Sequence, residues 1–525
     1  MTSKTPMKEV LHQPHTPDLN AAIHIGASSI SLLAMTDTGS GQMEHVDFLQ
    51  QSTPIAHDVF SKGKLSRKTI ERCVTIIQGF IASLQELGIE PNNANTRLVA
   101  TNILSEATNK DIFLNRIRIS CGINIEILDD GEMTRLIYLK TRRRLSDTPS
   151  MQKRTTLILH VGPGNTRAIL FRNGRIEHYS NYRLGTHRTS EAVDSILDDQ
   201  KNSRKVIREH VSGQLDLIRE DYGSQGIQDI VLIGYEIQLV SAFIQKSQQS
   251  TTQCSLQHFS ELCRQAASMG DDELVAHFRV DYQTAEALLP ALEINLTIAR
   301  ALNIDTIHIP GSDYEKGLLQ DLYSSTSLSE EFTEEVVRSA ESIAAKYRVN
   351  NQHAKHVAYL CRTIFEQTQE LHSLTDQDAL LLHIAAILHE CGGFISSRAH
   401  HKHSQYIIQN CEIFGLAYTD IELIALVARY HRNSEPKPGH SGYRELSDED
   451  RMRVCKLAAI LRVADALERT HSARIKDLEI RISKRRIHFL LKNITDANVE
   501  RLAMRSKGNL FENIFGLEIN LVEDK

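Results

Sequence analysis

One pattern that occurs twice in the first third of the chain restricts the fold more than any other feature. Residues 21–35 (AAIHIGASSISLLAM) are typical of a strand, a turn of small residues and a second strand. Residues 156–171 (TLILHVGPGNTRAILF) repeat that order after a polar gap. Helical patterns between them alternate with short strands at 97–100 and 125–130. Such an internal repeat predicts two similar α/β lobes that face each other.

The composition sets limits on the class of protein. A chain of 525 residues is too long for one hydrophobic core and predicts about three or four domains. Its 41% of apolar and 24% of charged residues are typical of a soluble globular protein. The formal net charge is −6, so we expect no membrane and no specific nucleic-acid partner. The eight cysteines include no CxxC pair, which favours reduced thiols and a cytoplasmic location.

Changes in the pattern divide the chain into segments. The first residues lack an apolar stretch of signal-peptide length, and residues 326–335 (TSLSEEFTEE) are typical of a polar linker. Near the C-terminus, strand, turn, strand, helix and strand patterns follow one another. The expected divisions are a disordered tail (1–18), two α/β lobes (19–145 and 146–325), an all-α domain (334–472) and a small α+β domain (473–525).

Histidines are concentrated in the predicted all-α domain. Residues 383–408 (HIAAILHECGGFISSRAHHKHSQYII) hold five of them, on two predicted helices separated by Cys391-Gly392-Gly393. His353 lies on an earlier amphipathic pattern, and His431 closes a later apolar run. Asp465 interrupts the apolar run KLAAILRVADALER, where a buried carboxylate without a partner would be costly. These residues predict either a metal or phosphate site between helices, or a bundle with hydrogen-bonded core histidines and no metal.

A histidine, a His-acid pair and a distant aspartate on consecutive helices resemble the HD-domain phosphohydrolases. By that resemblance the metal ligands would be His353, His389, Glu390 and Asp465. Glu390 stands where most HD domains have aspartate, so the site would differ in shape. Mixed imidazole and carboxylate ligands suit Mn, Fe or Zn better than Mg.

The chain as a whole resembles the exopolyphosphatase/guanosine pentaphosphate phosphohydrolase (Ppx/GppA) family. The motifs that carry the resemblance are VATNILSEATNKDIFL, IEILDDGEMTRLIYL and AAILHECGGFISSRAHHKHSQYIIQN. The resemblance implies two actin-like (ribonuclease H-like) lobes, an HD-like helical domain and a small C-terminal domain. It also implies a polyphosphate or guanosine penta- or tetraphosphate ligand, a divalent metal such as Mg or Mn, and a homodimer.

The positions that carry chemistry in that family differ here. The first hairpin has His24 and the second has His160 where the family has aspartates. Met133 occupies the place of the general-base glutamate, and Glu132 beside it is the remaining carboxylate. Pro163 removes a backbone N–H from the second turn. Imidazole is a poor ligand for Mg²⁺ and a thioether accepts no proton, so little of the parent reaction should remain.

Part of the phosphate cradle is retained, which keeps binding without turnover open. By the resemblance the phosphate-binding residues would be Gly26, Ser28, Ser29, Gly162, Gly164 and Thr166. We also consider that His24 and His160, with Glu132, form a transition-metal site, or that they are only packed residues. Three functions follow: a phosphohydrolase with an altered cleft, a metal-dependent phosphohydrolase acting through the HD-like domain, and a non-catalytic binder of phosphorylated ligands.

Overall fold

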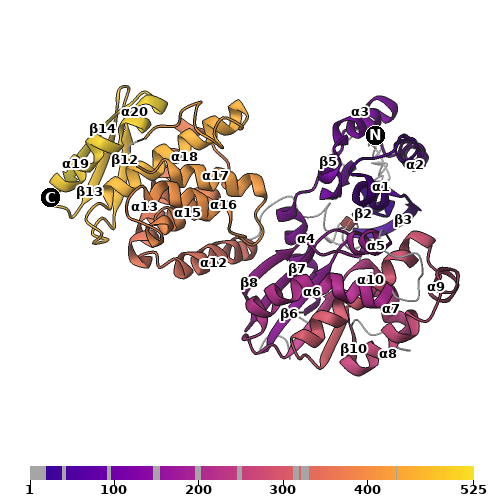
Figure 1. The fold of residues 1–525 in the computed structure, drawn as a ribbon. Coiled ribbons are helices and arrows are strands. Elements are labelled where there is room, and N and C mark those ends of the chain that lie inside the picture. Colours follow the sequence, from indigo (N-terminus) through magenta and orange to yellow (C-terminus); the bar gives the residue numbers. More distant parts are fainter. Residues whose placement is uncertain are drawn as a thin grey trace, which may run out of the picture.

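The computed structural model describes residues 19–37, 43–90, 96–145, 154–194, 203–244, 251–310, 319–320, 330–432 and 434–524. The predicted tail, residues 1–18, lies outside them. The described elements form three β-sheets with helices around them. Figure 1 shows the two lobes on one side and the helical and C-terminal domains on the other.

Lobe I contains a five-stranded sheet in the order β3-β2-β1-β4-β5. Its strands are β1 (Leu19–Ile25), β2 (Ser29–Asp37), β3 (Met43–Ser52), β4 (Thr96–Ala100) and β5 (Glu126–Ile127). Its helices are α1 (Ile55–Lys62), α2 (Arg67–Glu86), η1 (Asn102–Glu106), α3 (Lys110–Cys121) and α4 (Asp130–Leu145). The apolar faces of α2 and α3 pack with the sheet into one core.

Lobe II contains a six-stranded sheet in the order β10-β11-β9-β6-β7-β8. Its strands are β6 (Thr155–Val161), β7 (Thr166–Arg172), β8 (Arg175–Tyr182), β9 (Asp229–Ile233), β10 (Thr251–Ser255) and β11 (Thr306–Pro310). Its helices are α5 (Thr186–Asp194), α6 (Ser203–Tyr222), α7 (Tyr235–Ile244), α8 (Leu256–Ala266), α9 (Asp271–Phe278) and α10 (Tyr282–Ala301).

The internal repeat is visible in both sheets. β1 pairs antiparallel with β2 and parallel with β4, and β6 pairs in the same way with β7 and β9. Each hairpin turn is closed by one backbone hydrogen bond, from Gly26 to Ser29 at 2.8 Å and from Gly162 to Asn165 at 2.9 Å. The sequence patterns missed the third strands β3 and β8. β3 is exposed or half-buried along its described length, so no apolar alternation marks it.

The helical domain follows as α12 (Glu330–Lys346), α13 (Asn351–Gln367), α14 (Gln369–His372), α15 (Asp376–Leu388), η3 (Cys391–Phe394), α16 (His400–Gln409), α17 (Tyr418–Arg429) and α18 (Asp448–Leu467). Because α12 begins at Glu330, the prediction of a linker is wrong for residues 330–335. Residues 326–329 lie outside the described residues. None of the described helices combines the length and apolar content needed to cross a membrane.

The C-terminal domain is a three-stranded sheet with two helices. It comprises β12 (Leu478–Ile482), β13 (Arg486–Lys492), α19 (Asn498–Lys507), α20 (Asn509–Phe515) and β14 (Glu518–Asp524). One long helix was predicted, and it is broken at Gly508. A Cβ added at Gly508 would lie 2.9 Å from the Met504 carbonyl oxygen and 2.9 Å from Cδ1 of Ile519, so this position favours glycine.

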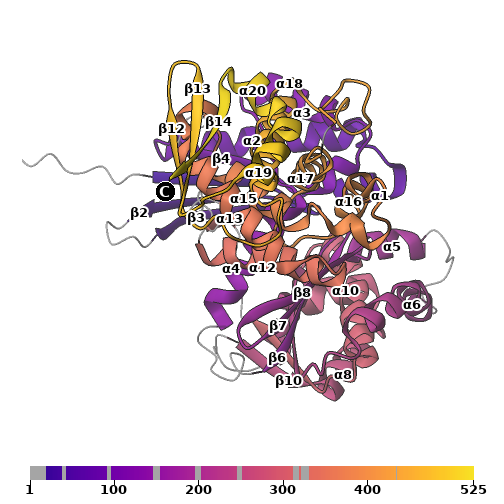
Figure 2. The same cartoon turned by 90° about the vertical axis from the view of Figure 1, so that its left-hand side faces the viewer.

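Lobe II and the helical domain share a hydrophobic core. Phe414 packs against Tyr179 of β8 with a ring-centroid distance of 5.6 Å, and Phe332 on α12 and Phe414 both pack against Tyr138 of α4, at 5.7 Å and 5.6 Å. Glu335 accepts a 3.0 Å hydrogen bond from the backbone N–H of Ile176 at β8. Figure 2 shows α12 next to β8. The helical domain is therefore attached to lobe II through packed aromatic rings rather than by a chain connection alone.

Candidate metal centre

His24 and His160 occupy equivalent positions at the ends of β1 and β6, and both are buried. Each ring lies over its own turn. A Cβ at Gly26 would lie 3.5 Å from Cε1 of His24, and one at Gly162 would lie 3.2 Å from Cε1 of His160. The imidazoles therefore fill the space directly above the glycine turns, where the resemblance implied oxygen ligands for a metal.

The cleft between the lobes is closed by side chains from both. Arg188 on α5 donates two hydrogen bonds to the carboxylate of Glu106, at 2.7 and 2.8 Å, and its guanidinium lies 4.7 Å from the ring centroid of Phe60. Phe60 packs on the second turn, since a Cβ at Gly164 would lie 2.9 Å from its Cζ. A cavity of about 50 Å³ remains, roughly the volume of one or two water molecules.

The predicted catalytic positions of the cleft hold a buried thioether and a carboxylate that is engaged in an ion pair. Met133 is buried and lines the small cavity. Glu132 accepts two hydrogen bonds from Arg135, at 2.6 and 2.8 Å. Among the described residues, the groups of three metal-binding side chains with donor atoms within 4.8 Å of one another do not include His24, His160 or Glu132. The structure thus does not assemble the transition-metal site considered for these three residues.

The predicted phosphate-binding residues lie at the two hairpin turns, but few face the cavity. Gly162 and Gly164 line it. The hydroxyl of Thr166 donates to the Leu184 carbonyl at 2.6 Å, and that of Ser29 accepts from Gln50 at 3.0 Å. Gly26 and Ser28 belong to the other turn and are not among the residues that line the cavity.

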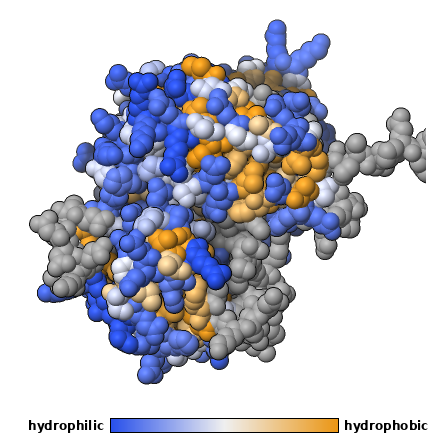
Figure 3. Space-filling model, turned by 90° about the vertical axis from the view of Figure 1, so that its right-hand side faces the viewer, coloured by the Kyte–Doolittle hydropathy of each residue, from blue (hydrophilic) through white to orange (hydrophobic). Residues whose placement is uncertain are grey.

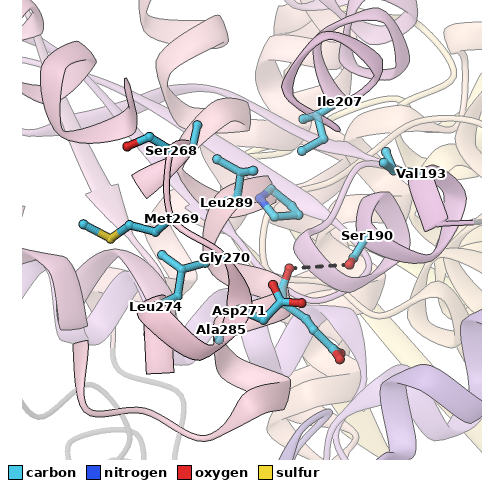
Figure 4. A pocket seen from close by; sticks show the side chains of 13 residues that line it. Ser190, Val193, Ile207, Ser268, Met269, Gly270, Asp271, Leu274, Ala285 and Leu289 are labelled. Atoms are coloured by element: carbon cyan, nitrogen blue, oxygen red, sulfur yellow. Dashed lines mark hydrogen bonds between the residues drawn. The ribbon is translucent and has the colours of Figure 1, made fainter. Parts of the chain in front are cut away.

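Lobe II contains a second cavity, of about 310 Å³, between α5, α6 and α10. Figure 4 shows Ser190, Asp271, Met269 and Leu289 around it, with Ser190 donating to the Glu286 carbonyl at 3.4 Å. Its charged lining residues are Asp271 and Glu286, and no lysine, arginine or histidine is among them. Negative charge without a cation disfavours phosphate, so this cavity is a poor candidate for the site.

In the helical domain, His353 stands at the centre of the predicted metal site. Asn350 caps α13 by accepting the backbone N–H of His353 at 3.2 Å, which fixes the residue in the first turn. Its side chain is buried, and neither ring nitrogen has a hydrogen-bond partner among the described residues. Its Nε2 lies 3.9 Å from Oε2 of Glu390 and 4.0 Å from Oδ1 of Asp465. Burial, followed by the neighbouring His389, lowers the pKa of His353 to about 4.

His389 and Asp465 complete this group from α15 and α18. Donor atoms of His353, His389 and Asp465 lie within 4.8 Å of one another. Nδ1 of His389 donates to the Ala386 carbonyl at 2.7 Å, so its Nε2 carries the lone pair. Oδ2 of Asp465 is paired with Lys507 of α19. Although burial raises the pKa of Asp465, Lys507 and the two nearby histidines, His389 and His431, hold it well below its usual range.

The Cys391-Gly392-Gly393 turn brings α16 close to this group. A Cβ at Gly392 would lie 2.1 Å from the His400 carbonyl oxygen, so only glycine fits there. Ser404 accepts from the Gly392 N–H at 2.9 Å and donates to the His389 carbonyl at 2.7 Å. Ala399, immediately before α16, has a φ of +56°, a strained conformation for a residue with a Cβ. As a result His400 reaches His431, with their Nε2 atoms 3.1 Å apart.

His471 is a site residue that the sequence patterns missed. Its ring stacks on His353 with a centroid distance of 3.8 Å, and it forms a second group of candidate ligands with His353 and Glu390. It follows α18 in a left-handed conformation, with φ +53°. No periodicity marks a residue in such a turn, so only the tertiary structure identifies it.

A cavity of about 210 Å³ opens over the cluster. Glu390, His400, His431 and Asp465 line one part of it. Arg432, Arg469 and Lys507 line the rest, so three cationic side chains surround the approach to the cluster. Arginine binds phosphate through two parallel hydrogen bonds, and this charge pattern suits a phosphate-bearing ligand.

The residues present fit a divalent metal ion. Separations of 3.9 and 4.0 Å are too long for hydrogen bonds, yet they leave room for an ion between a nitrogen and two carboxylates. The buried ring nitrogens of His353 and Nε2 of His389 lack other partners among the described residues, as ligands without their ion would. Imidazole nitrogens and carboxylates favour Mn, Fe or Zn.

The protein consists of two actin-like lobes joined to a helical domain that carries a cluster of side chains able to hold a metal ion. The structure is similar to the crystal structure of an exopolyphosphatase from Cytophaga hutchinsonii, with a TM-score of 0.50 and 16% identity, over 58% of this chain and 97% of that one. At this low identity the similarity shows the fold alone. This structural similarity confirms the fold that was expected from the sequence.

The sequence comparison identifies the family. Residues 34–326 match the Ppx/GppA phosphatase family, and residues 337–505 match domain III of Ppx/GppA phosphatases. The chain therefore belongs to the Ppx/GppA phosphatase family, as the resemblance indicated.

Curated relatives match along most of their length. The chain is 24% identical to a guanosine-5'-triphosphate,3'-diphosphate pyrophosphatase of Aliivibrio fischeri, over 85% of this chain and 87% of the relative. It is 22% identical to the protein of the same name from Photobacterium profundum, over 84% of this chain and 86% of the relative.

Proposed function

We propose that this chain is a metal-dependent phosphohydrolase whose working site lies in the helical domain, and that its inter-lobe cleft is degenerate. The proposed metal ligands are His353, His389, Glu390 and Asp465. The proposed ligand class is polyphosphate or a guanosine penta- or tetraphosphate-like nucleotide, because relatives that match most of the chain bear the name of a guanosine pentaphosphate pyrophosphatase.

The observation that carries the proposal is the environment of His353. An imidazole that is 1% exposed, with no hydrogen-bond partner for either nitrogen among the described residues, is costly unless another group satisfies it. Two carboxylates and a second imidazole surround it at distances suited to a shared cation. A bundle whose core histidines are all hydrogen-bonded would not leave this residue without partners.

The chain's own residues divide the work of such a site. When bound, a divalent cation supplies Lewis-acid activation of water and of a phosphoryl oxygen. Lys507 holds Oδ2 of Asp465, so Oδ1 stays turned toward His353. Arg432 and Arg469 lie at the cavity and are placed to bind the negative oxygens of the substrate. Glu390 is half-buried and lines the cavity, so it lies between the buried cluster and the opening.

The closed inter-lobe cleft supports the proposal that this cleft is degenerate. Its lobes are joined by Arg188 and Glu106, and its cavity of about 50 Å³ has Met133 at the position of the base. A second candidate function, binding without turnover, remains for the cleft because Gly162 and Gly164 still line this cavity. Occupation by a polyphosphate would require the lobes to separate.

The experiment is phosphate release from polyphosphate and from guanosine pentaphosphate, with metal-free protein to which Mn²⁺ is returned. Wild type, Asp465→Asn and the double variant His160→Asp with Met133→Glu are compared. We expect Mn²⁺-dependent release by wild type and by the cleft variant, and none by Asp465→Asn. Asp465→Asn, purified in the same way, also controls for contaminating phosphatases. Full activity of Asp465→Asn would contradict the proposal, and binding without release in all three proteins would favour the non-catalytic function.

Quaternary structure is a separate proposal, because the homodimer rests on the family resemblance. Figure 3 shows hydrophobic residues gathered in patches among hydrophilic ones on the face that carries both lobes. Exposed apolar side chains include Ile112 and Ile119 on α3, at 58% and 68% exposure. Sedimentation of the purified chain measures its mass, and a monomer at micromolar concentration would contradict the dimer.

A further inference from the structure

His400 and His431 face each other in a way that hydrogen bonding between two neutral rings does not explain. Nδ1 of His431 lies 2.6 Å from the Ala428 carbonyl oxygen, and Nδ1 of His400 lies 3.2 Å from that of Ser397. A carbonyl oxygen only accepts, so each Nδ1 carries the proton and each Nε2 presents a lone pair. These two Nε2 atoms are 3.1 Å apart. Two lone pairs at this distance repel each other unless a cation lies between them, either a metal ion or a proton that makes one ring an imidazolium.

The two rings are held in place from both sides. His431 is 2% exposed and follows the last turn of α17. His400 begins α16, which is held against Gly392 by the contact that only glycine permits there. The left-handed Ala399 adds strain immediately before His400. A strained residue persists only where the surrounding structure fixes it, and such residues concentrate at functional sites.

We propose that His400 and His431 bind a divalent transition-metal ion of their own, next to the ion assigned to His353. The neighbouring ion and the substrate class rest on the proposed function. The binding of an ion by His400 and His431 does not. Nitrogens that each lie about 2.1 Å from one ion, at nearly a right angle, are roughly 3 Å apart, as these two are. Two imidazoles select Mn, Fe, Co or Zn rather than Mg or Ca.

His400 and His431 are the close protein donors of this second position, because the groups of three donors within 4.8 Å of one another among the described residues do not include them. Glu390 and Asp465 line the same cavity as the two histidines. The remaining coordination positions face a cavity with Arg432 and Arg469. Two adjacent cations clamp the attacking and leaving oxygens of a phosphoryl group, so the substrate of this pair is a phosphate ester or anhydride.

The test is the number of metal ions bound per chain. Full-length protein is stripped with chelator, incubated with Mn²⁺ or Zn²⁺, freed of excess metal and measured by inductively coupled plasma mass spectrometry. The variants are His400→Ala, the pair His353→Ala with Glu390→Gln, and His403→Ala as matched control. His403 lies on the same helix one turn away and is not among the residues that line the cavity. His400 is half-exposed, so its replacement spares the core, and thermal unfolding verifies the fold of each variant.

We expect two ions in wild type and in His403→Ala, and one in each of the other variants. One ion in wild type that His400→Ala retains would overturn the inference while leaving the proposed function intact. One ion that is lost in His400→Ala and kept without His353 and Glu390 would support the inference and contradict the proposed function. Absence of metal from wild type would overturn both.

Discussion

The inter-lobe cleft and the helical-domain cluster both contain buried histidines. The space around the histidines is filled in the cleft and open in the cluster. In the cleft, His24 and His160 lie over glycine turns, and Phe60 and the Arg188–Glu106 pair close the space in front of them. In the helical domain, His353 and His389 face carboxylates across gaps of ion size, under a cavity of about 210 Å³. The comparison teaches that the residue type does not define a metal site. What distinguishes the helical-domain cluster is that the fold brings a carboxylate and a second imidazole to within 4.8 Å of one another around a buried ring.

The largest effect on activity is expected when one buried histidine in each region is replaced by glutamine and the two variants are compared. His389→Gln removes a proposed ligand while keeping a side chain of similar size. We expect phosphate release to fall about 100- to 1,000-fold, since loss of a metal ligand costs several kcal/mol of transition-state stabilisation. His24→Gln, in the cleft, should change the rate less than about twofold. A steady-state assay with Mn²⁺ measures both, and equal losses would remove the distinction between the regions.

The second effect concerns stability of the metal-free protein. Lys507→Met leaves the buried carboxylate of Asp465 without its counter-ion, and breaking a buried ion pair typically costs about 3 kcal/mol. We expect a lower thermal midpoint that Mn²⁺ partly restores and that Asp465→Asn relieves in the double variant. Lys492→Met is the matched control, because Lys492 is 44% exposed in its pair with Glu479. A Lys507→Met midpoint like that of the control would show that the pair contributes little.

A smaller effect is expected at the closed cleft. Arg188→Ala breaks the pair with Glu106 and removes the cation over Phe60. Partly exposed pairs contribute about 1 kcal/mol or less, so the fold should persist. We expect faster hydrogen exchange in α1 and α5, with no gain in phosphate release. Release that appears in this variant and survives Asp465→Asn would assign activity to the cleft.

The smallest effect is a dependence of stability on pH at a contact between the helical domain and lobe II. Glu412 accepts a 2.6 Å hydrogen bond from the backbone N–H of Asn181 at β8. Burial, followed by Asp221 and Asp130, raises the pKa of Glu412 from 4.5 to about 7. The folded state therefore takes up a proton, and the stability from this group is fully present below about pH 4.5 and lost as the pH rises through about 7.

Glu412→Gln should remove that loss. We expect the variant to be more stable than wild type at pH 8, by about 1 kcal/mol or less because the side chain is partly exposed, and similar to wild type at pH 5. Thermal midpoints of both proteins at pH 5, 6.5 and 8 give the comparison. A wild-type advantage that grows with pH would mean that the ionised carboxylate stabilises the contact.

The sequence predicted those parts of the fold that periodicity encodes. The repeated hairpins and most helices followed from apolar spacing, and glycine marked the ends of several elements. β3 was missed because its mixed, exposed pattern is stabilised by pairing with β2 rather than by burial. The helix that was expected to be continuous near the C-terminus is interrupted at Gly508, where an added Cβ would lie 2.9 Å from the Met504 carbonyl oxygen.

For the candidate site, sequence reasoning supplied residues and not their arrangement. His353, His389 and Asp465, chosen through the family resemblance, lie together. Glu390 groups instead with His353 and with His471, which no pattern marked. Lys507 was missed because it comes from another domain, and the contact of His400 with His431 depends on a glycine turn between helices. Such long-range contacts follow from packing, which a single sequence does not display.

The most direct measurement is anomalous X-ray scattering from crystals grown with Zn²⁺ or Mn²⁺ and recorded at the edge of the metal. The account predicts a peak within bonding distance of Nε2 of both His353 and His389, and none at His24 or His160. A peak in the cleft with the helical domain empty would contradict it.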